Sequence, residues 1–382
     1  MDVNIIAGST TKFGELWHVS PRDMVRQVVE DVIDQAMISR SKLQAIFIGN
    51  MLSSSLGGQD HLGAFFAEEL GLSIPAVKVE GACASGGLAV HTGCLAIMSG
   101  LYDTVLVVGV EKMTDYKPET VASVLMGAGS EAEREAGLTF PALYALMTRV
   151  HMKKWSTTEK DLAYVSVKNH FHASLNSHAQ FPYQVTLEQV LKSPVIASPL
   201  KLLDCSPITD GAAAIILTRN KKAAIRNKTV SIIASVVATD TLGLAEREDL
   251  SSLKASVIAA KNAYHQSGIS PKDIDVVEVH DCFTIAEIIA MEDLGFFPKG
   301  KASFAIKEGV TKLGGYPVVN TSGGLKASGH PVGATGVKQV VEIYQQLTGR
   351  GGKKQVKDAR IGLTHNVGGS GATAVIHILK CL

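Results

Sequence analysis

The feature of this sequence that most restricts its fold is an order of short apolar runs and helical patterns that occurs twice. The first occurrence holds these segments at 45–49, 60–70, 76–80, 83–100 and 104–109. The second holds them at 275–279, 284–294, 317–320, 332–347, 360–363 and 372–379. Short apolar runs that alternate with longer helical patterns are typical of β–α units, so both occurrences predict mostly parallel sheets covered by helices.

A duplicated β–α unit predicts two similar halves that share a crevice, because each half offers a sheet edge and a helix N-terminus. The pattern after Cys83 is apolar on every side, which predicts a helix buried in the middle, opposite residues 322–323 of the second half. Two sheets that enclose such helices give an α/β fold of five layers, α-β-α-β-α. We assign the N-terminal half to residues 1–110 together with 201–220. Residues 111–200, which lack the repeat, form an inserted loop domain, and residues 221–382 form the C-terminal half.

Composition excludes several classes of function. The chain has 382 residues, 46% of them hydrophobic, and a formal net charge of +1, so neither a nucleic-acid surface nor a membrane surface is expected. No Gly-x-Gly-x-x-Gly opens a helix after the first strand and no Walker-type loop is present, which disfavours dehydrogenases and nucleotide triphosphatases. Residues 1–4 do not resemble a secretion signal, and five widely spaced cysteines favour reduced thiols in the cytoplasm.

Cys83 lies at the turn between the strand-like run 76–80 and the helical pattern that follows. A thiol there lies in the positive field of a helix N-terminus, which favours the thiolate, and the free N–H groups of the first turn can hold an anionic oxygen. The sequence therefore predicts a nucleophile and part of an oxyanion hole in one turn. The alternative is a small apolar residue packed beneath a helix.

Three other segments end predicted strands, where α/β ligand sites form. They are His280 to Phe283 with Cys282, the turn around His330, and the glycine-rich segment 364–371. Each has a structural alternative: a hydrogen-bonded histidine, a simple turn and a hairpin loop. Zinc is a further alternative, because thiolates and imidazoles are its ligands, and the four candidates are Cys83, His280, Cys282 and His330. Their spacing matches no compact zinc motif, so we predict no metal.

These segments together resemble the thiolases over essentially the whole chain. The resemblance rests on Gly-Ala-Cys-Ala-Ser-Gly-Gly at 81–87, His-Asp-Cys-Phe at 280–283, Ser-Gly-His-Pro at 328–331, the final glycine loop, and Asp-Cys-Ser-Pro-Ile-Thr-Asp-Gly at 204–211. The His-Asp-Cys-Phe form is similar to sterol-carrier-protein-type and archaeal-type thiolases. The better-known branch has Asn-Glu-Ala-Phe there and a second catalytic cysteine in a Cys-x-Gly loop. This chain has Asn366-Val367-Gly368 at that loop, and Cys282 takes the place of the missing thiol.

The resemblance implies a role for each residue. Cys83 is the nucleophile, His330 its base, and Cys282 the acid and base of the second half-reaction. The N–H groups of Cys83 and Gly368 form one oxyanion hole, and His330 with His280 holds the enolate oxygen. The substrate-binding residues it implies are Ser206 on the pantetheine, Phe283 in the tunnel, and Phe140 and Tyr144 in the wall of the acyl pocket. Cys94 is expected in the core, and Cys205 and Cys381 are expected to be structural.

The implied reaction is the reversible condensation of two acetyl-CoA to acetoacetyl-CoA and CoA, feeding hydroxymethylglutaryl-CoA and mevalonate synthesis. Two alternatives stay open: a degradative 3-ketoacyl-CoA thiolase for longer chains, and a non-catalytic scaffold subunit. The inserted domain would bind CoA, and no cofactor beyond the CoA thioester substrates is expected. The expected assembly is a homodimer or a dimer of dimers, consistent with the apolar strand 104–109. Hydroxymethylglutaryl-CoA synthase and a small zinc-ribbon/OB-fold protein are possible partners.

Overall fold

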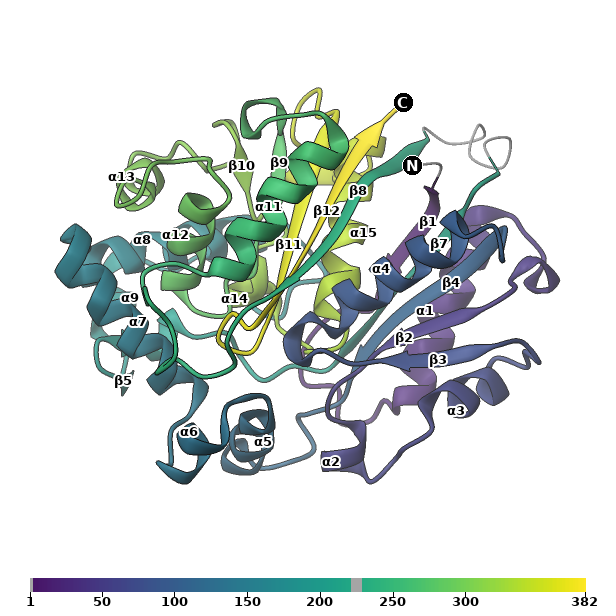
Figure 1. The fold of residues 1–382 in the computed structure, drawn as a ribbon, viewed down its shortest axis with the longest axis horizontal. Coiled ribbons are helices and arrows are strands. Elements are labelled where there is room, and N and C mark those ends of the chain that lie inside the picture. Colours follow the sequence, from purple (N-terminus) through teal and green to yellow (C-terminus); the bar gives the residue numbers. More distant parts are fainter. Residues whose placement is uncertain (1–2, 221–228) are drawn as a thin grey trace.

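A computed structural model describes residues 3–220 and 229–382 (Figure 1). The expected boundary at 220/221, together with residues 1–2 and 221–228 of the two predicted halves, lies outside the described residues. The strands of the N-terminal half are β1 (Val3–Thr10), β2 (Ile46–Gly49), β3 (Ala76–Val79), β4 (Thr104–Glu111) and β7 (Gly211–Thr218). Those of the C-terminal half are β8 (Val230–Thr239), β9 (Val276–Glu278), β10 (Val318–Val319), β11 (Ile361–Gly368) and β12 (Thr373–Cys381).

The strands form one hydrogen-bonded sheet in the order β10-β9-β11-β12-β8-β1-β7-β4-β2-β3. The prediction of two separate sheets is wrong. β1 pairs with β8 from Val3↔Ile232 to Ile5↔Val230, and this pairing joins the two half-sheets into one. The expectation of mostly parallel strands is also wrong. Only β2 with β3 and β4, and β9 with β10 and β11, run parallel; the other pairs are antiparallel. The repeat did not show this, because β1, β7 and β8 lie outside it and because the alternation of strands and helices does not set the direction in which β11 and β12 pair.

The five predicted layers are present. Helices α1 (Pro21–Ala36) and α3 (Leu62–Glu69) share a hydrophobic cluster with the outer face of the N-terminal half-sheet. Helices α4 (Ser85–Met98) and α15 (Thr335–Thr348) lie between the two half-sheets and share a cluster with both. Helices α11 (Lys254–Ser267) and α12 (Thr284–Asp293) cover the outer face of the C-terminal half-sheet. Cys94 is fully buried in the central layer, which confirms its assignment to the core.

Glycines bring the N-termini of the two central helices together. A Cβ atom on Gly86 of α4 would lie 2.7 Å from the Gly333 oxygen and 2.9 Å from the Gly336 nitrogen, so only glycine permits this approach. The turn of Cys83 therefore faces residues 333–336, and not 322–323 as the repeat suggested. The reason is that a short helix, α14 (Gly324–Ser328), ends before the central helix of the C-terminal half begins at Thr335.

Residues 111–200 carry most of the remaining helices. They are α5 (Pro118–Leu125), α6 (Glu131–Glu135), α7 (Phe140–Trp155), α8 (Glu159–Ala173) and α9 (Leu187–Lys192), followed by the short strands β5 (Val195–Ala197) and β6 (Leu200–Lys201). Figure 1 shows α7 and α8 beside α12, and all three contribute to one hydrophobic cluster. Two further helices of the described residues are α2 (Ser53–Gly57) and α13 (Ala302–Lys307). Within residues 3–220 and 229–382, none of the helices has the length and apolar character needed to cross a bilayer.

Candidate active site

Cys83 follows β3 in a strained turn. The preceding residue, Ala82, has a left-handed φ of 53°, a conformation that costs a non-glycine residue roughly 1–2 kcal/mol. The Ser85 side chain holds the turn, because its hydroxyl donates to the Ala82 oxygen at 2.6 Å and accepts from the Gly81 nitrogen at 3.0 Å. A 3-10 turn, Ala82–Ala84, then leads directly into α4. This strained turn therefore fixes the position of the thiol at the start of the central helix.

His330 is fixed from both halves of the molecule. Its backbone nitrogen donates to Thr209 Oγ1 at 2.9 Å, and its Nδ1 lies 2.7 Å from Thr335 Oγ1 on the first turn of α15. Glu111, at the end of β4, accepts from the Gly333 nitrogen at 3.0 Å and from two backbone nitrogens of the loop after β2. The catalytic turn of the C-terminal half is thus attached to loops of the N-terminal half.

His280 and Cys282 follow β9, and the residue between them anchors the motif. The buried Asp281 carboxylate accepts from Asn169 Nδ2 at 2.7 Å and from the Leu325 nitrogen at 2.6 Å. A Cβ on Gly324 would lie 2.1 Å from Asp281 Oδ2, so this contact also requires glycine. Asp281 therefore positions its two neighbours against the short helix α14.

The three turns converge. A side-chain sulfur or nitrogen from each of Cys83, His280 and His330 lies within 4.8 Å of the other two. The two imidazole rings are 5.0 Å apart and nearly perpendicular, at 87°. A cavity of about 340 Å³ opens over them. Seven of the residues predicted from the sequence line it: Cys83, Phe140, Tyr144, Ser206, Cys282, Phe283 and His330.

Two predicted residues and one other cysteine lie differently from what the sequence suggested. His280 lies behind the cavity lining, against Cys83 and His330. Gly368 packs against the nucleophile turn, where a Cβ would lie 2.5 Å from the Gly81 oxygen; the next residue, Gly369, lines the cavity, and its N–H faces the Cys83 thiol. Cys205, expected to be structural, lines the cavity beside Ser206 because residues 205–206 pair with 282–283.

The hydrogen bonds of Asn366 determine which nitrogen of His280 carries a proton. The amide orientation is fixed by two backbone groups, since Oδ1 accepts from the Gly87 nitrogen at 3.0 Å and Nδ2 donates to the Cys83 oxygen at 3.0 Å. The same Nδ2 lies 3.2 Å from His280 Nδ1 and can only donate to it. Nδ1 of neutral His280 is therefore the acceptor, and its proton is on Nε2.

His330 has the opposite tautomer. The Thr335 hydroxyl donates to the Pro331 oxygen at 2.9 Å, so its lone pairs face His330 Nδ1, which donates. His330 Nε2 then carries a lone pair. Both Nε2 atoms are buried without a partner among the described residues. Nε2 of His280 is therefore a hydrogen-bond donor, and Nε2 of His330 is a base close to it. His280 could ligate a metal only if it lost its hydrogen bond with Asn366.

Burial controls the charge state of the thiols and imidazoles. It raises the pKa of Cys83 to about 12, although the Gly369 N–H opposes this change, and it lowers the pKa of His330 to about 3. Burial therefore opposes the thiolate that the helix N-terminus favours, and the free protein is expected to hold Cys83 as a thiol. The site holds a neutral thiol and a neutral imidazole.

Tyr144 links the second thiol to the glycine loop. Burial places the pKa of Cys282 well above its ordinary value, and the nearby Tyr144 hydroxyl lowers it in part. The same hydroxyl lies 3.2 Å from the Gly369 oxygen, and the Tyr144 ring lies 4.6 Å from that of Phe283. Tyr144 thus contacts Cys282 in addition to forming the wall predicted from the sequence.

Family models match both halves of the chain. The model of the thiolase N-terminal domain matches residues 3–221, and that of the thiolase C-terminal domain matches residues 237–381. The chain belongs to the thiolase family. As a thiolase it is an acyltransferase, and both its fold and its resemblance to the family are confirmed.

Relatives cover the whole length of this thiolase. It is 49% identical over 381 residues to the acetyl-CoA acetyltransferase of Methanothermobacter thermautotrophicus, covering 99% of each chain. The corresponding protein of Methanocaldococcus jannaschii is 46% identical, again over 99% of each chain. Rabbit sterol carrier protein 2 is 34% identical over 92% of this chain and 66% of its own length.

Two solved structures share the fold of this thiolase at low identity. An Ltp2-ChsH2(DUF35) aldolase superposes with a TM-score of 0.84 at 21% identity, covering 99% of this chain and 97% of that one. Human mitochondrial 3-ketoacyl-CoA thiolase superposes with a TM-score of 0.76 at 19% identity, covering 99% and 98%. These two likenesses support the architecture of the five layers.

Proposed function

We propose that this thiolase condenses two molecules of acetyl-CoA to acetoacetyl-CoA and CoA, through an acyl-enzyme on Cys83. The observation that carries the proposal is the convergence of Cys83 with His280 and His330, in opposite tautomers, beneath a cavity that Cys282 also lines. A base, a donor and a second thiol are what a two-step acyl transfer needs. The names of the two archaeal relatives support acetyl-CoA as the substrate.

Acylation begins from the neutral pair. His330 Nε2 takes the proton of Cys83 as the sulfur attacks the thioester carbon of the first acetyl-CoA. The oxyanion accepts from the N–H groups of Cys83 and of the 368–369 loop, and each donor is typically worth about 2.7–4 kcal/mol. When the bond from carbon to the CoA sulfur breaks, the leaving thiolate takes the proton of Cys282. The products are acetyl-Cys83, a Cys282 thiolate, a protonated His330 and free CoA.

Condensation uses the charges left by acylation. The Cys282 thiolate removes a proton from the methyl carbon of the second acetyl-CoA, and the enolate oxygen accepts from Nε2–H of both His280 and protonated His330. The enolate carbon then attacks the acetyl-Cys83 carbon. The Cys83 sulfur leaves and takes its proton back from His330, which restores every group. Cleavage of a 3-ketoacyl-CoA by CoA is the same sequence reversed.

Substrate contacts follow from the cavity lining. We propose that Ser206 contacts the pantetheine arm and that Phe283, Phe140 and Tyr144 surround the acyl group, since all four line the cavity. Tyr144 is only 1% exposed and is held by Phe283 and Gly369, so it forms a rigid wall. A rigid wall beside the thiols favours a short acyl chain over the longer substrates of a degradative thiolase.

The test is intact-protein mass spectrometry after mixing with acetyl-CoA. Wild-type protein is expected to gain about 42 Da, the mass of one acetyl group on a nucleophilic side chain. The Cys83→Ala variant should gain nothing, and Cys205→Ala, which removes the other cavity thiol not used in the reaction, should gain the same mass as wild type. Folded wild-type protein without an adduct would contradict the proposal.

The neutral state of Cys83 predicts a specific pH dependence. Because burial raises its pKa to about 12, the thiol form persists through about pH 5 to 9 and the thiolate grows only as pH approaches that value. We therefore expect no thiolate difference absorbance between wild type and Cys83→Ala at neutral pH. A thiolate signal near neutral pH, absent from the variant, would show that an ion pair with His330 exists before substrate binds.

We propose that a second copy of the chain covers the β3 edge. The strand 104–109, suggested by the sequence, is not available because β4 lies inside the sheet between β2 and β7. β3 is the edge strand of the N-terminal half-sheet, and Val77 on it is 51% exposed, as is Met98 on the neighbouring α4 (Figure 1). An unprotected edge with apolar neighbours is typical of an interface.

The dimer can be tested by light scattering on purified protein. Met98→Asp is expected to convert a dimer into a monomer, because it places a charge in an apolar contact. Phe304→Asp provides the control, since Phe304 on α13 is 63% exposed but lies on the C-terminal half. A monomeric wild type would contradict the dimer, and equal dissociation of both variants would contradict an interface at the β3 edge.

We propose that no metal or organic cofactor takes part, because the thioester itself acidifies the carbon and the tautomer of His280 opposes metal binding. The free state of all five cysteines supports a cytoplasmic location. Acetoacetyl-CoA would pass to hydroxymethylglutaryl-CoA synthase for mevalonate synthesis. We also propose a small zinc-ribbon/OB-fold protein as partner; the name of the Ltp2-ChsH2(DUF35) neighbour, which includes a second component, supports a protein partner in general.

A further inference from the structure

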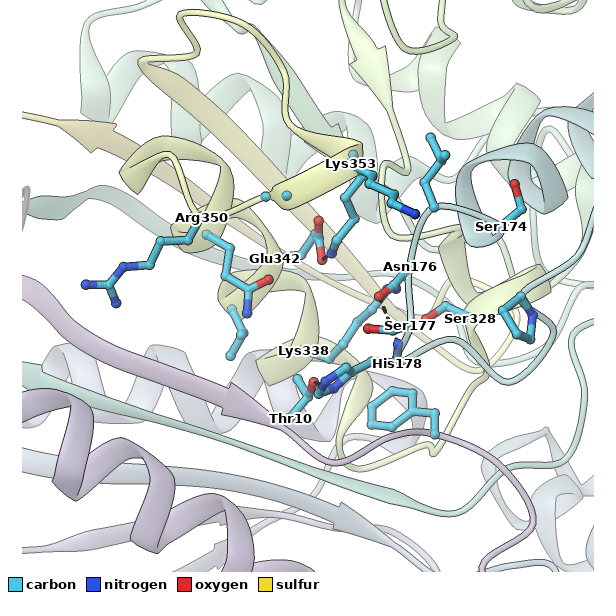
Figure 2. Close-up of a pocket in the computed structure, with 18 of the residues that line it drawn as sticks. Thr10, Ser174, Asn176, Ser177, His178, Ser328, Lys338, Glu342, Arg350 and Lys353 are labelled. Atoms are coloured by element: carbon cyan, nitrogen blue, oxygen red, sulfur yellow. Dashed lines mark hydrogen bonds and ion pairs between the residues drawn. The ribbon is translucent and has the colours of Figure 1, made fainter.

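A second cavity, of about 490 Å³, shares no lining residue with the one over the cysteines. Its walls come from the end of β1, the loop 174–178 after α8, the second half of α15, and the loop 350–354. Figure 2 shows Lys338 and Glu342 on one side of this space, facing Asn176, Ser177 and His178. The volume lies within the range of small-molecule sites.

Cationic side chains dominate the lining. Lys338, Arg350, Lys353 and Lys354 line the cavity, against one carboxylate, that of Glu342. The two buried lysines each have one carboxylate neighbour: Lys354 forms an ion pair with Glu342, and Lys338 lies 3.3 Å from Glu278 Oε2 behind the wall. Lys353 is exposed and makes no hydrogen bond or ion pair within the described part of the chain, and Figure 2 shows it reaching over the cavity.

The opposite wall is polar and uncharged. Asn176 is fixed by its donation to the Ser322 oxygen at 2.9 Å, and its Oδ1 accepts from the His178 nitrogen at 3.2 Å. His178 Nδ1 lies 3.3 Å from Thr10 Oγ1. The Ser177 hydroxyl, beside them, has no partner within the described residues. Free cationic and hydroxyl donors at the edge of an open cavity suit the oxygens of a phosphate group.

We propose that this cavity binds a small phosphorylated metabolite, with its phosphate between Lys353 and the Ser177 hydroxyl, and that the bound ligand changes the rate of the thiolase reaction. The binding of the ligand is argued from the cavity alone. The change in the reaction rate rests on the proposed function. The physical link is short. Ser328, two residues before His330, lines the cavity, and α15 carries both Lys338 in the cavity wall and Thr335, the partner of His330.

An added phosphate acts on His330 through charge. The positive charge of Lys338 holds the pKa of His330 down, in addition to the larger effect of burial. A dianion beside Lys338 offsets that charge and makes His330 a stronger base. Occupancy of the cavity is therefore expected to raise the rate of acylation when His330 accepts the Cys83 proton.

Calorimetric titration with pyrophosphate and with ribose 5-phosphate tests the site, in the absence of CoA, because CoA carries phosphate groups of its own. Wild type is expected to bind ribose 5-phosphate, and Lys353→Glu and Ser177→Asp should each bind it at least about tenfold more weakly. Lys357→Glu is the matched control, an exposed lysine of the same loop outside this cavity, and should bind like wild type.

Each outcome decides one part of the proposal. Absence of binding to wild type, or equal weakening by all three substitutions, would overturn the site and indicate nonspecific attraction of anions. Tighter binding of pyrophosphate than of ribose 5-phosphate would replace the phosphate ester with an inorganic anion as ligand. Specific binding that leaves the acetyl-transfer rate unchanged would overturn the effect on His330. Because calorimetry measures the heat of ligand binding, it tests the site independently of the acetyl-transfer reaction.

Discussion

Cys282→Ala is expected to separate the two half-reactions. The variant should still gain one acetyl group from acetyl-CoA, because Cys83 and His330 are untouched, while the overall rate of condensation falls by about 10²–10⁴-fold, the usual contribution of a general acid and base. Hydrogen exchange at the methyl carbon of acetyl-CoA in deuterated water should stop, since Cys282 is the group proposed to remove that proton. Mass spectrometry follows the first result, and deuterium uptake by acetyl-CoA the second.

The matched control is Cys205→Ala, the other thiol of the cavity lining. Both substitutions remove a thiol from the same cavity, so a general effect of volume or packing would slow both variants alike. Continued deuterium exchange in Cys282→Ala would assign the carbon base to another group, with His330 as the next candidate. Loss of the acetyl adduct in Cys282→Ala would show that protonation of the leaving CoA thiolate limits acylation.

The sequence supported the order of layers better than the connections between them. The repeat of β–α units predicted the two halves and the buried position of α4, because apolar periodicity records which faces are covered. It did not predict that β1 and β8 join the half-sheets, since the pairing of two distant strands leaves no periodic signal of its own. Nor did it give the partner of the Cys83 turn, which depends on the glycine contacts of Gly86 with Gly333 and Gly336.

In the candidate site, too, the sequence predicted some features and not others. Residue types that act by themselves, such as Cys83, Cys282 and His330, were recognisable from their place in turns between elements, although α14 separates His330 from the preceding strand. Asn366 was noted only as a departure from the Cys-x-Gly pattern, because a neutral amide has no chemistry that marks it in a sequence. The charge of Cys83 could not be predicted in full, since a helix N-terminus is visible in the sequence while the burial that opposes its effect is not.

Asn366→Asp is expected to lower the rate of condensation by about 10²–10³-fold, the usual cost of one lost donor to a developing oxyanion. The new carboxylate has nearly the same shape and can still accept from the Gly87 nitrogen. It cannot donate to His280 Nδ1, and as an acceptor it draws the His280 proton from Nε2 to Nδ1. The enolate oxygen then meets a lone pair in place of a donor. The ¹⁵N chemical shifts of the His280 ring, assigned by comparison with a His280→Asn variant, should exchange between its two nitrogens.

A double-mutant cycle distinguishes this tautomer effect from damage to the fold or from the added negative charge. In His280→Asn the side-chain amide keeps its N–H donors whatever residue stands at position 366. Asn366→Asp should therefore cost much less in the His280→Asn background than in wild type if its effect passes through the tautomer. A charge that disturbs Cys83 directly, or a loosened contact with the Cys83 oxygen, would cost the same in both backgrounds. Equal losses would leave Asn366 as a structural tie between β11 and the nucleophile turn, and would require another explanation for the unpartnered Nε2 of His280.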